Sequence, residues 1–585
     1  MRRTDGSPVK DRKFRLSWLT SWIHRSTQDP LDGSKSGFVV AITGHGPDAL
    51  LELRQAVARL CFMHTTEGAA PEPECKREID LQTAALGAPA GGRRPRSSGK
   101  RDGSLLERYA FSRHLRTVVW WARRVWYATQ PVDPRMRIAL ERRWTELPDH
   151  VKTPSQTLGR MGIGCEGTHG VFPKCNFACK PCYHSREANR VRIDGPHTIA
   201  RVGEQMAFFQ RTRAPHAHAQ LIGGEVSLLD PDDHAEALGV MRSHGREPMS
   251  FTHGDFEYDY LRRLALGPDG RPRFRRLSFA LHIDTTMVGR RGIARTDSEE
   301  ALDPNRRKCA GMFRRLRKEH GVRSFLAHNM TVTPANVDQI PGVIRRCRSL
   351  GFGMFSFQPA AYVGDERRWN ADYRALDPDR VWERIEEGAG ARLPFQLFQL
   401  GDERCNRSAF GFYTGDRWHS VVDDTDPRDL AVRDAFLDYF GGVYWKAPLH
   451  LLLPRLIRVT IAHPDVLPLG IGWIRRTLRR IGGPTVLLRQ RIVPMTFVMH
   501  RFMHAADVKP AWDLLEHGEM SPDPRIRETQ ERLQACSYGM AHPETGRIVP
   551  ACVQHAVLDP AENLRLSLEL PLAARRPPTG RAASE

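Results

Sequence analysis

The sequence predicts an α/β fold built on a parallel sheet, and three observations support this prediction. Between residues 165 and 365, short apolar stretches alternate with amphipathic stretches of helical period. Strands that alternate with helices at this spacing are typical of parallel βαβ units. The residues that suit a functional site, among them Cys175, Asp284 and Gln358, follow the expected strands, and sites in parallel barrels gather at those strand ends.

The expected elements follow one another in a regular order. Asp230 is a plausible cap for one helix, and Gly351 ends another. We expect strands at 168–173, 219–222, 249–252, 277–283, 324–333 and 354–358, and helices at 194–210, 231–243, 304–320 and 338–350.

Three cysteines form a C-x3-C-x2-C array in the loop after the first expected strand, at Cys175, Cys179 and Cys182. Three thiolates from one loop can hold three irons of a cubane cluster and leave the fourth iron open to a small molecule. A zinc site is the alternative, with Cys179 and Cys182 as a pair that His184 or Cys165 completes. A disulfide is a further alternative, but nothing in the sequence suggests secretion.

This array, followed by the aromatic Tyr183, resembles the signature of the radical S-adenosylmethionine (SAM) enzymes. About forty residues on, an apolar stretch ends in Gly223-Gly224-Glu225, similar to the strand end whose backbone receives the methionyl amine of SAM in that family. The resemblance covers residues 165–365 and implies a partial (β/α)6 barrel. It also implies that Cys175, Cys179 and Cys182 bind a [4Fe–4S] cluster and that Gly223, Gly224 and Glu225 hold methionine.

The resemblance also implies the chemistry. An electron from a reductase, ferredoxin or flavodoxin-type donor would cleave SAM at the cluster and release a 5′-deoxyadenosyl radical that abstracts hydrogen from an unactivated C–H bond. The cofactors carry this chemistry, and the protein positions them. Asp284, at the end of the fourth expected strand, is a candidate ribose partner; a turn or helix cap is the alternative role. We assign no catalytic residue.

The composition of the chain limits the classes of protein to which it can belong. The chain has 585 residues, a formal net charge of +20 and eleven cysteines, which are too few for a disulfide scaffold of this length. The basic N-terminus lacks an uninterrupted apolar stretch of signal-peptide length, and no run of eighteen apolar residues occurs. We therefore expect a cytoplasmic protein with several domains.

The domain organisation follows from shifts in composition. A segment rich in Ala, Gly, Pro, Ser and Arg predicts a flexible linker between two basic regions. We expect a basic region with a small α/β unit at 1–86 (strand 37–43, helix 48–61), a linker at 87–104, a basic amphipathic helical segment at 105–163, the barrel at 164–365, an insert with amphipathic helices at 366–505, a C-terminal cysteine-containing domain at 506–570 and a disordered tail at 571–585.

Several stretches combine apolar and basic residues at helical spacing. Phe14, Trp18 and Trp22 recur four residues apart, and residues 105–130 and 443–500 repeat the theme. Basic amphipathic helices are typical of membrane surfaces, here the inner face; an ordinary buried face with solvated arginines is the alternative. Nucleic acid is a weaker account of the charge, because no RNA-binding signature accompanies it. In 471–481, Ile471, Ile474, Leu478 and Ile481 alternate with Arg475, Arg476, Arg479 and Arg480.

Three later cysteines are candidates for a second metal site. Cys536 and Cys552 flank a turn at 543–546 that could bring both thiols together, and Cys405 in a polar loop could add a third. Three separate thiols are the alternative. Cys347 is expected to be a buried lone thiol.

A closer resemblance bears on these cysteines. Residues 357–364, the Cys405 loop, 502–504 and the Cys536–Cys552 segment resemble the tetraether lipid synthases, radical SAM enzymes that join lipid tails; the dense N-terminal cysteine group of that pattern is missing. This resemblance implies a second, auxiliary cluster at Cys405, Cys536 and Cys552, and a lipid acyl or isoprenoid substrate at a membrane surface. The alternatives are a radical SAM enzyme that modifies a peptide or RNA, and a zinc-stabilised basic nucleic-acid-binding protein.

Overall fold

The computed structural model describes residues 117–121, 125–127, 129–184, 186–362, 369, 373–374 and 376–572. The expected α/β unit in 1–86 and the Phe14–Trp22 stripe lie outside these residues. The chain divides into two compact units, and everything described below from Trp126 onward belongs to one of them.

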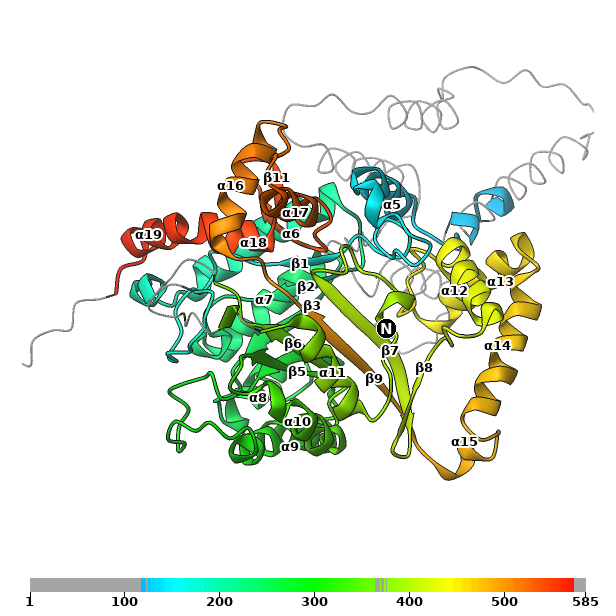
Figure 1. Cartoon of the computed structure of the whole chain (residues 1–585), viewed down its shortest axis with the longest axis horizontal. Coiled ribbons are helices and arrows are strands. Elements are labelled where there is room, and N and C mark those ends of the chain that lie inside the picture. The colour runs from blue at the N-terminus through cyan, green and yellow to red at the C-terminus, as the bar shows by residue number, and fades with distance from the viewer. Residues whose placement is uncertain are drawn as a thin grey trace, which may run out of the picture. The chain divides into compact units, whose positions relative to one another are not determined.

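The described fold is a single eleven-stranded sheet in the order β11-β10-β1-β2-β3-β4-β5-β6-β9-β7-β8 (Figure 1). β10, β1 to β6 and β9 run parallel, whereas β7, β8 and β11 are antiparallel additions at the edges. The strands are β1 Cys165–Gly167, β2 Ala217–Leu221, β3 Arg246–Thr252, β4 Arg276–His282, β5 Arg323–Val332, β6 Met354–Pro359, β7 Asn406–Thr414, β8 Arg417–Ser420, β9 Ile492–His500, β10 Tyr538–His542 and β11 Arg547–Pro550.

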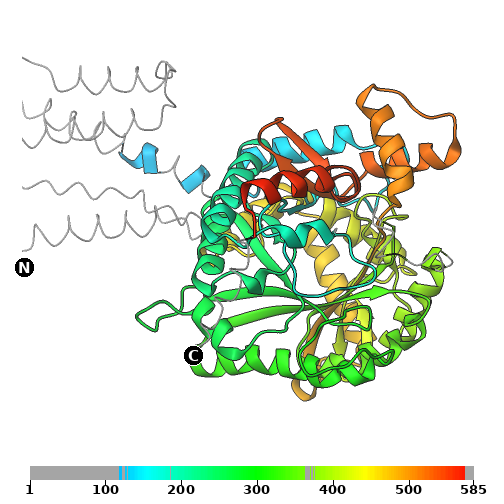
Figure 2. The same cartoon turned by 90° about the vertical axis from the view of Figure 1, so that its left-hand side faces the viewer.

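The helices connect these strands and cover the outer face of the curled sheet (Figure 2). α6 to α11 follow β1 to β6 in βα alternation; α5 precedes β1, and α12 to α19 follow β8 along the chain. The helices are α5 Pro134–Glu146, α6 Gly195–Thr212, α7 Pro231–Ser243, α8 Tyr258–Ala265, α9 Asp303–His320, α10 Ile340–Cys347, α11 Pro378–Ala389, α12 Pro427–Tyr439, α13 Leu449–Ala462, α14 Val466–Arg480, α15 Val486–Arg489, α16 Ala505–Glu516, α17 Pro524–Gln534, α18 Ala551–Val553 and α19 Asp559–Glu569.

Side chains alternate between the helix layer and the barrel interior. In β4, Leu277, Phe279 and Leu281 are buried in the main core with the helices, whereas Ser278 and His282 line the interior. This period of two places one face of each strand against helices and leaves the other face to form the site.

In five of the described helices an N-cap aspartate is followed directly by proline, which fixes where the helix starts. The aspartate carboxylate accepts a hydrogen bond from a backbone N–H of the first turn, and the proline occupies a position that needs no N–H donor. The pairs are Asp133-Pro134, Asp230-Pro231, Asp377-Pro378, Asp426-Pro427 and Asp523-Pro524.

The prediction of a partial parallel α/β barrel is confirmed, with two corrections to its elements. β1 is Cys165–Gly167, so the predicted strand at 168–173 is wrong; Thr168 instead bonds Ile222 and Gly170 adopts a positive φ of 63°. α8 was not predicted. The other barrel strands and helices lie where they were expected, within a few residues at their ends.

The sheet also extends beyond 164–365, because β7 to β11 come from the segments expected to be an insert and a C-terminal domain. The two flanks of the sheet, one ending in β10 and β11 and the other in β7 and β8, approach each other at Asn406, the first residue of β7. The Asn406 amide donates to Ser537 Oγ (3.0 Å), just before β10. In the described part of the chain, no helix has the length and apolar character needed to cross a membrane.

Candidate active site

The three-cysteine loop lies directly after the β1 segment, at the C-terminal ends of the parallel strands. Cys175, Cys179 and Cys182 are half-buried and line one cavity of about 600 Å³. Burial, and then the neighbouring Cys182 and Cys175 thiols, raise the pKa of the Cys179 thiol. A metal that accepts thiolates would remove this penalty.

The loop is tied to the strands around it. Ala178 N–H and Lys180 N–H donate to the Val288 and Thr286 carbonyls (2.8 and 3.0 Å). The Phe177 ring stacks on the His253 ring, with 3.8 Å between centroids. The second ring nitrogen of His253, Nε2, lies 2.8 Å from Asn176 Oδ1. The end of β3 therefore fixes the conformation of the cysteine loop.

Gly223 and Gly224 lie at the end of β2, in contact with the segment that leads into the loop. A Cβ on Gly224 would lie 2.2 Å from the Lys174 carbonyl oxygen, and one on Gly223 would lie 2.7 Å from the Phe172 ring. Gly224 N–H and Glu225 N–H donate to the Phe172 and Lys174 carbonyls (2.8 and 2.9 Å). Glycine is therefore required here because the loop backbone crosses the strand end.

Glu225 is almost fully buried, and its carboxylate joins the ends of β2 and β3. It accepts hydrogen bonds from Thr252 Oγ1 (2.6 Å), His253 N–H (2.9 Å) and Ser227 N–H (2.9 Å). Glu225 lines the cavity together with both glycines. The Glu225 carboxylate therefore holds the ends of β2 and β3 together, and the protein itself supplies its hydrogen-bond donors.

Asp284 lies beside the cavity but does not line it; His282, to which the sequence assigned no role, does. Asp284 accepts hydrogen bonds from Thr286 and from Thr331 N–H, and Oδ2 lies 2.8 Å from His282 Nε2. Burial opposes the charged carboxylate, but His282 and these donors outweigh it and lower its pKa. His282 therefore presents its side chain to the cavity, and Asp284 orients it from behind.

The cavity extends down the barrel interior, with apolar and polar walls. Met249, Phe251 and Phe325 provide part of the apolar wall. Asn329 Oδ1, Tyr538 Oη and His218 Nδ1 are buried atoms without a hydrogen-bond partner among the described residues. Further amide and hydroxyl side chains on this wall include Gln220, Ser278, Ser356, Gln358, Asn406 and Ser408.

Cys405, Cys536 and Cys552 come together where the flanks of the sheet meet. Arg532 Nε donates to Cys405 Sγ (3.2 Å). Burial raises the pKa of the Cys552 thiol, and the Cys536 and Cys405 thiols lie close enough to contribute. Cys165 joins this region, because its N–H donates to the Ser537 carbonyl (2.7 Å).

Among the described residues, no three His, Cys, Asp or Glu side chains already converge at the spacing of a bound metal ion. The donor sets nevertheless fit iron–sulfur chemistry, because each set supplies three thiols and thiolates are the usual cluster ligands. Cys347 is buried in the core, as expected.

His555 is a site residue that the sequence did not reveal. It lies in a π-helical turn, Gln554–Leu558, and such turns are often found at functional sites. Its Nδ1 lies 2.7 Å from Asp559 Oδ2, and its ring packs against Tyr183, 4.5 Å between centroids. His555 lines the main cavity. A histidine four residues before an aspartate was the available signal, but only the fold brings it beside the cysteine loop.

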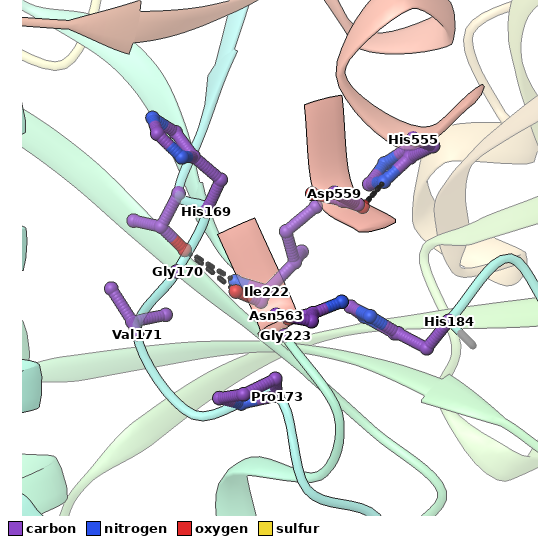
Figure 3. A pocket seen from close by; sticks show the side chains of 11 residues that line it. His169, Gly170, Val171, Pro173, His184, Ile222, Gly223, His555, Asp559 and Asn563 are labelled. Carbon is purple, nitrogen blue, oxygen red and sulfur yellow. Dashed lines mark hydrogen bonds and ion pairs between the residues drawn. The ribbon is translucent and has the colours of Figure 1, made fainter. Parts of the chain in front are cut away.

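A second, small pocket of about 10 Å³ adjoins His555, with room for about one water molecule (Figure 3). Asp559 and Asn563 of α19 form one side, and His184 reaches it from the cysteine loop. Asn563 Nδ2 is buried there without a partner in the described chain, so a single ordered water would satisfy it.

The fold and the site define a partial parallel α/β barrel with a three-cysteine loop at its C-terminal face. No protein-family model and no curated protein matches the chain. Among solved structures, the chain is similar to anSMEcpe with bound AdoMet, at 13% identity and a TM-score of 0.26, over 38% of this chain and 57% of that one. It is also similar to Streptococcus suis SuiB, solved with its precursor peptide SuiA, at 11% identity and a TM-score of 0.24, over 48% and 51% of the two chains. The chain thus spans between half and three-fifths of these structures.

Proposed function

We propose that this protein is a SAM-dependent radical enzyme whose [4Fe–4S] cluster is bound by Cys175, Cys179 and Cys182. One observation carries the proposal: these three thiols and the Gly223–Glu225 strand end line the same cavity at the C-terminal ends of parallel strands. When bound, the cluster and SAM supply a radical that abstracts hydrogen from an unactivated C–H bond. We assign the methionine end of SAM to the backbone at Gly223–Glu225 and its ribose to the neighbourhood of His282.

The chain's own residues position the reactants. His253 holds the cysteine loop through Phe177 and Asn176, and Glu225 fixes His253 through its backbone. His282 presents its ring to the cavity with Asp284 behind it. Preorganised groups of this kind supply orientation and exclude water, while the cofactor performs the bond cleavage.

A peptide is the substrate class that the cavity supports best. Asn329 Oδ1 needs a donor, and amide and hydroxyl side chains occur on most strands of the wall. Water or a peptide N–H would satisfy Asn329 Oδ1, whereas an alkyl chain would leave it unpaired at a cost of about 1–3 kcal/mol. The lipid substrate expected from the sequence finds no such support. Phe251 and Phe325 suit the apolar side chains of a peptide.

We also propose that Cys405, Cys536 and Cys552 bind an auxiliary cluster. The support is their meeting at the junction of the two sheet flanks, beside Arg532. Positive charge next to thiolates favours the ionised form that a cluster needs.

Metal content and SAM cleavage test the enzyme assignment. Iron, sulfide and zinc are measured per chain after anaerobic reconstitution, together with deoxyadenosine released on reduction. About eight irons would indicate two cubane clusters and about four would indicate one, at four irons each. Cys179→Ala should abolish deoxyadenosine release, Cys552→Ala should retain uncoupled release, and Cys347→Ala is the matched control. Zinc without deoxyadenosine would instead support the zinc-stabilised binding protein.

Isotope transfer tests the substrate class. The reconstituted enzyme is given SAM and a fully deuterated cell extract separated into peptide, lipid and RNA fractions. The hydrogen abstracted from the substrate ends in deoxyadenosine, so mass spectrometry of this product reports its source. Deuterium from the peptide fraction alone is the expected result; deuterium from the lipid or RNA fraction would overturn the peptide assignment while leaving the radical enzyme intact.

A further inference from the structure

The segment from α13 to α15 presents an apolar face to solvent, outside the β7–β8 edge of the sheet (Figure 1). In α13, the side chains of Leu449, Leu453, Ile457 and Ile461 are 73%, 51%, 49% and 76% exposed, at a spacing of four residues. This spacing places all four on one side of the helix. The face continues through Leu467, Ile471, Ile474, Leu487, Leu488 and Ile492, all of which are exposed.

Helix α14 turns two of its arginines toward the protein and exposes the other two. Arg476 Nε lies 2.5 Å from Asp429 Oδ1, and the Asp429 residue is fully buried; Arg480 Nη2 also lies 3.4 Å from Asp429 Oδ2. Trp473 Nε1 donates to the Val421 carbonyl on the same side (2.7 Å). The apolar residues Ile471 and Ile474 are about half exposed. The apolar stripe expected at 471–481 is therefore divided: Ile471 and Ile474 are exposed, whereas Ile481 is buried.

The charge of the segment indicates what covers this face. Residues 449–492 contain eight arginines and one aspartate, with no lysine or glutamate. Arg475, Arg479, Arg489 and Arg491 are exposed, and none of the four forms an ion pair among the described residues. Exposed aliphatic side chains flanked by unpaired arginines suit the boundary of an anionic bilayer.

We propose that the α13–α15 face binds an anionic lipid bilayer, with its aliphatic side chains in the acyl boundary and its arginines at the headgroups. A protein partner fits less well, because protein interfaces are enriched in aromatic residues and methionine as well as arginine, whereas the ten apolar residues of this face are all leucine or isoleucine. The proposal is independent of the radical chemistry and concerns where the enzyme works, not what its cavity holds.

Liposome flotation of the full chain tests the proposal. Vesicles of phosphatidylcholine alone are compared with vesicles that contain about 30% phosphatidylglycerol, a composition chosen to give the surface charge of an anionic leaflet. We expect the protein to float with the anionic vesicles and to be released by high salt. The double variant Leu453→Asp/Ile471→Asp should reduce flotation about tenfold or more, because each aspartate must be buried at the interface.

A matched control distinguishes this face from apolar exposure in general. Leu564 and Leu568 of α19 are 61% and 76% exposed but lie on another element, so Leu564→Asp/Leu568→Asp should float like the wild type. Thermal unfolding checks that both variants are folded. Absence of flotation, or equal flotation of both variants, would overturn the proposal. So would a dimer detected by light scattering that Leu453→Asp/Ile471→Asp abolishes, which would assign the face to a second copy of the chain.

Discussion

At the scale of single residues, the strand end at Gly224 shows how closely the cysteine loop is packed. A Cβ there would lie 2.2 and 2.3 Å from the Lys174 and Pro173 carbonyl oxygens, and backbone cannot yield as a flexible side chain can. We expect Gly224→Ala to displace the loop, to lower stability by about 1–3 kcal/mol and to reduce iron bound on reconstitution.

Gly239 provides the control for this prediction. It lies in α7, and no atom lies within 4 Å of the position that a Cβ would occupy there. Gly239→Ala should therefore be neutral or slightly stabilising in a helix. Equal iron content and urea midpoints for the two variants would contradict the packing argument.

His169 and Glu562 form a buried pair that makes stability depend on pH. His169 Nδ1 lies 2.9 Å from Glu562 Oε1, and Nε2 lies 2.7 Å from the Ala541 carbonyl oxygen. Burial lowers the pKa of His169, but Glu562 outweighs it, and the net pKa is raised. The folded state therefore binds the proton more tightly, and this contribution is complete below about pH 6.5 and is lost as pH rises through the raised pKa.

Glu562→Gln should remove this contribution. We expect the variant to lose more unfolding free energy at pH 6 than at pH 9, by about 1–3 kcal/mol for a buried charged hydrogen bond. Urea unfolding at both pH values measures it. Glu569→Gln, exposed on the same helix, is the control and should show no such difference.

At the scale of elements, a buried ion pair joins β3 to β1. Arg246 Nε and Nη2 lie 2.9 and 3.1 Å from the two Glu166 carboxylate oxygens, and both side chains are fully buried. Breaking such a pair costs about 3–5 kcal/mol where nothing else compensates the remaining charge; Arg213 Nη1, 3.8 Å from Glu166 Oε1, is a further partner here and sets the cost at the lower end of this range. We expect Arg246→Met to be destabilised by this amount in chemical unfolding and Arg246→Met/Glu166→Leu to recover much of it. A double variant as unstable as the single one would show that packing, not charge, sets the cost.

The elements also show what could be predicted from the sequence. Strands β2 to β6 were predicted because each is a short apolar stretch that lies between stretches of helical period. β1 was misplaced because it has only three residues, and its position depends on pairing with β10 and β2, far away in the chain. His282 was overlooked for a related reason. The alternation of side chains along β4 defines two faces, but it does not show which of them faces the cavity.

At the scale of the whole molecule, the meeting of the sheet flanks could not be predicted from local pattern. Asn406 and Ser537 are 131 residues apart, and their contact brings Cys405 to Cys536. The three-cysteine loop needed no such information, because its spacing is local. That loop could therefore be predicted from its local spacing. The grouping of Cys405, Cys536 and Cys552 depends on contacts between distant segments, and from the sequence it rested on a resemblance.

Two histidines with lowered pKa values make the fold sensitive to acid, and one of them, His500, lies at this closure. His500 Nδ1 lies 2.5 Å from Asn406 Oδ1, and burial lowers the pKa of His500 to about 4. Burial likewise lowers the pKa of His234 to about 3. Between these values and about pH 6.5 the unfolded chain binds more protons than the folded one, so stability rises with pH across this window and falls on acidification.

We therefore expect the unfolding free energy to fall between pH 7 and pH 4.5, with His500 contributing about 2–3 kcal/mol of the loss. His500→Gln should shrink the loss by that amount, because glutamine can bond Asn406 without taking up a proton. The exposed His450→Gln should leave it unchanged. Urea unfolding at pH 7, 5.5 and 4.5 measures all three proteins. If the unfolding free energies of the two variants change equally with pH, His500 does not take up a proton on unfolding. The loss of stability in acid would then come from other groups than those at the junction of the sheet.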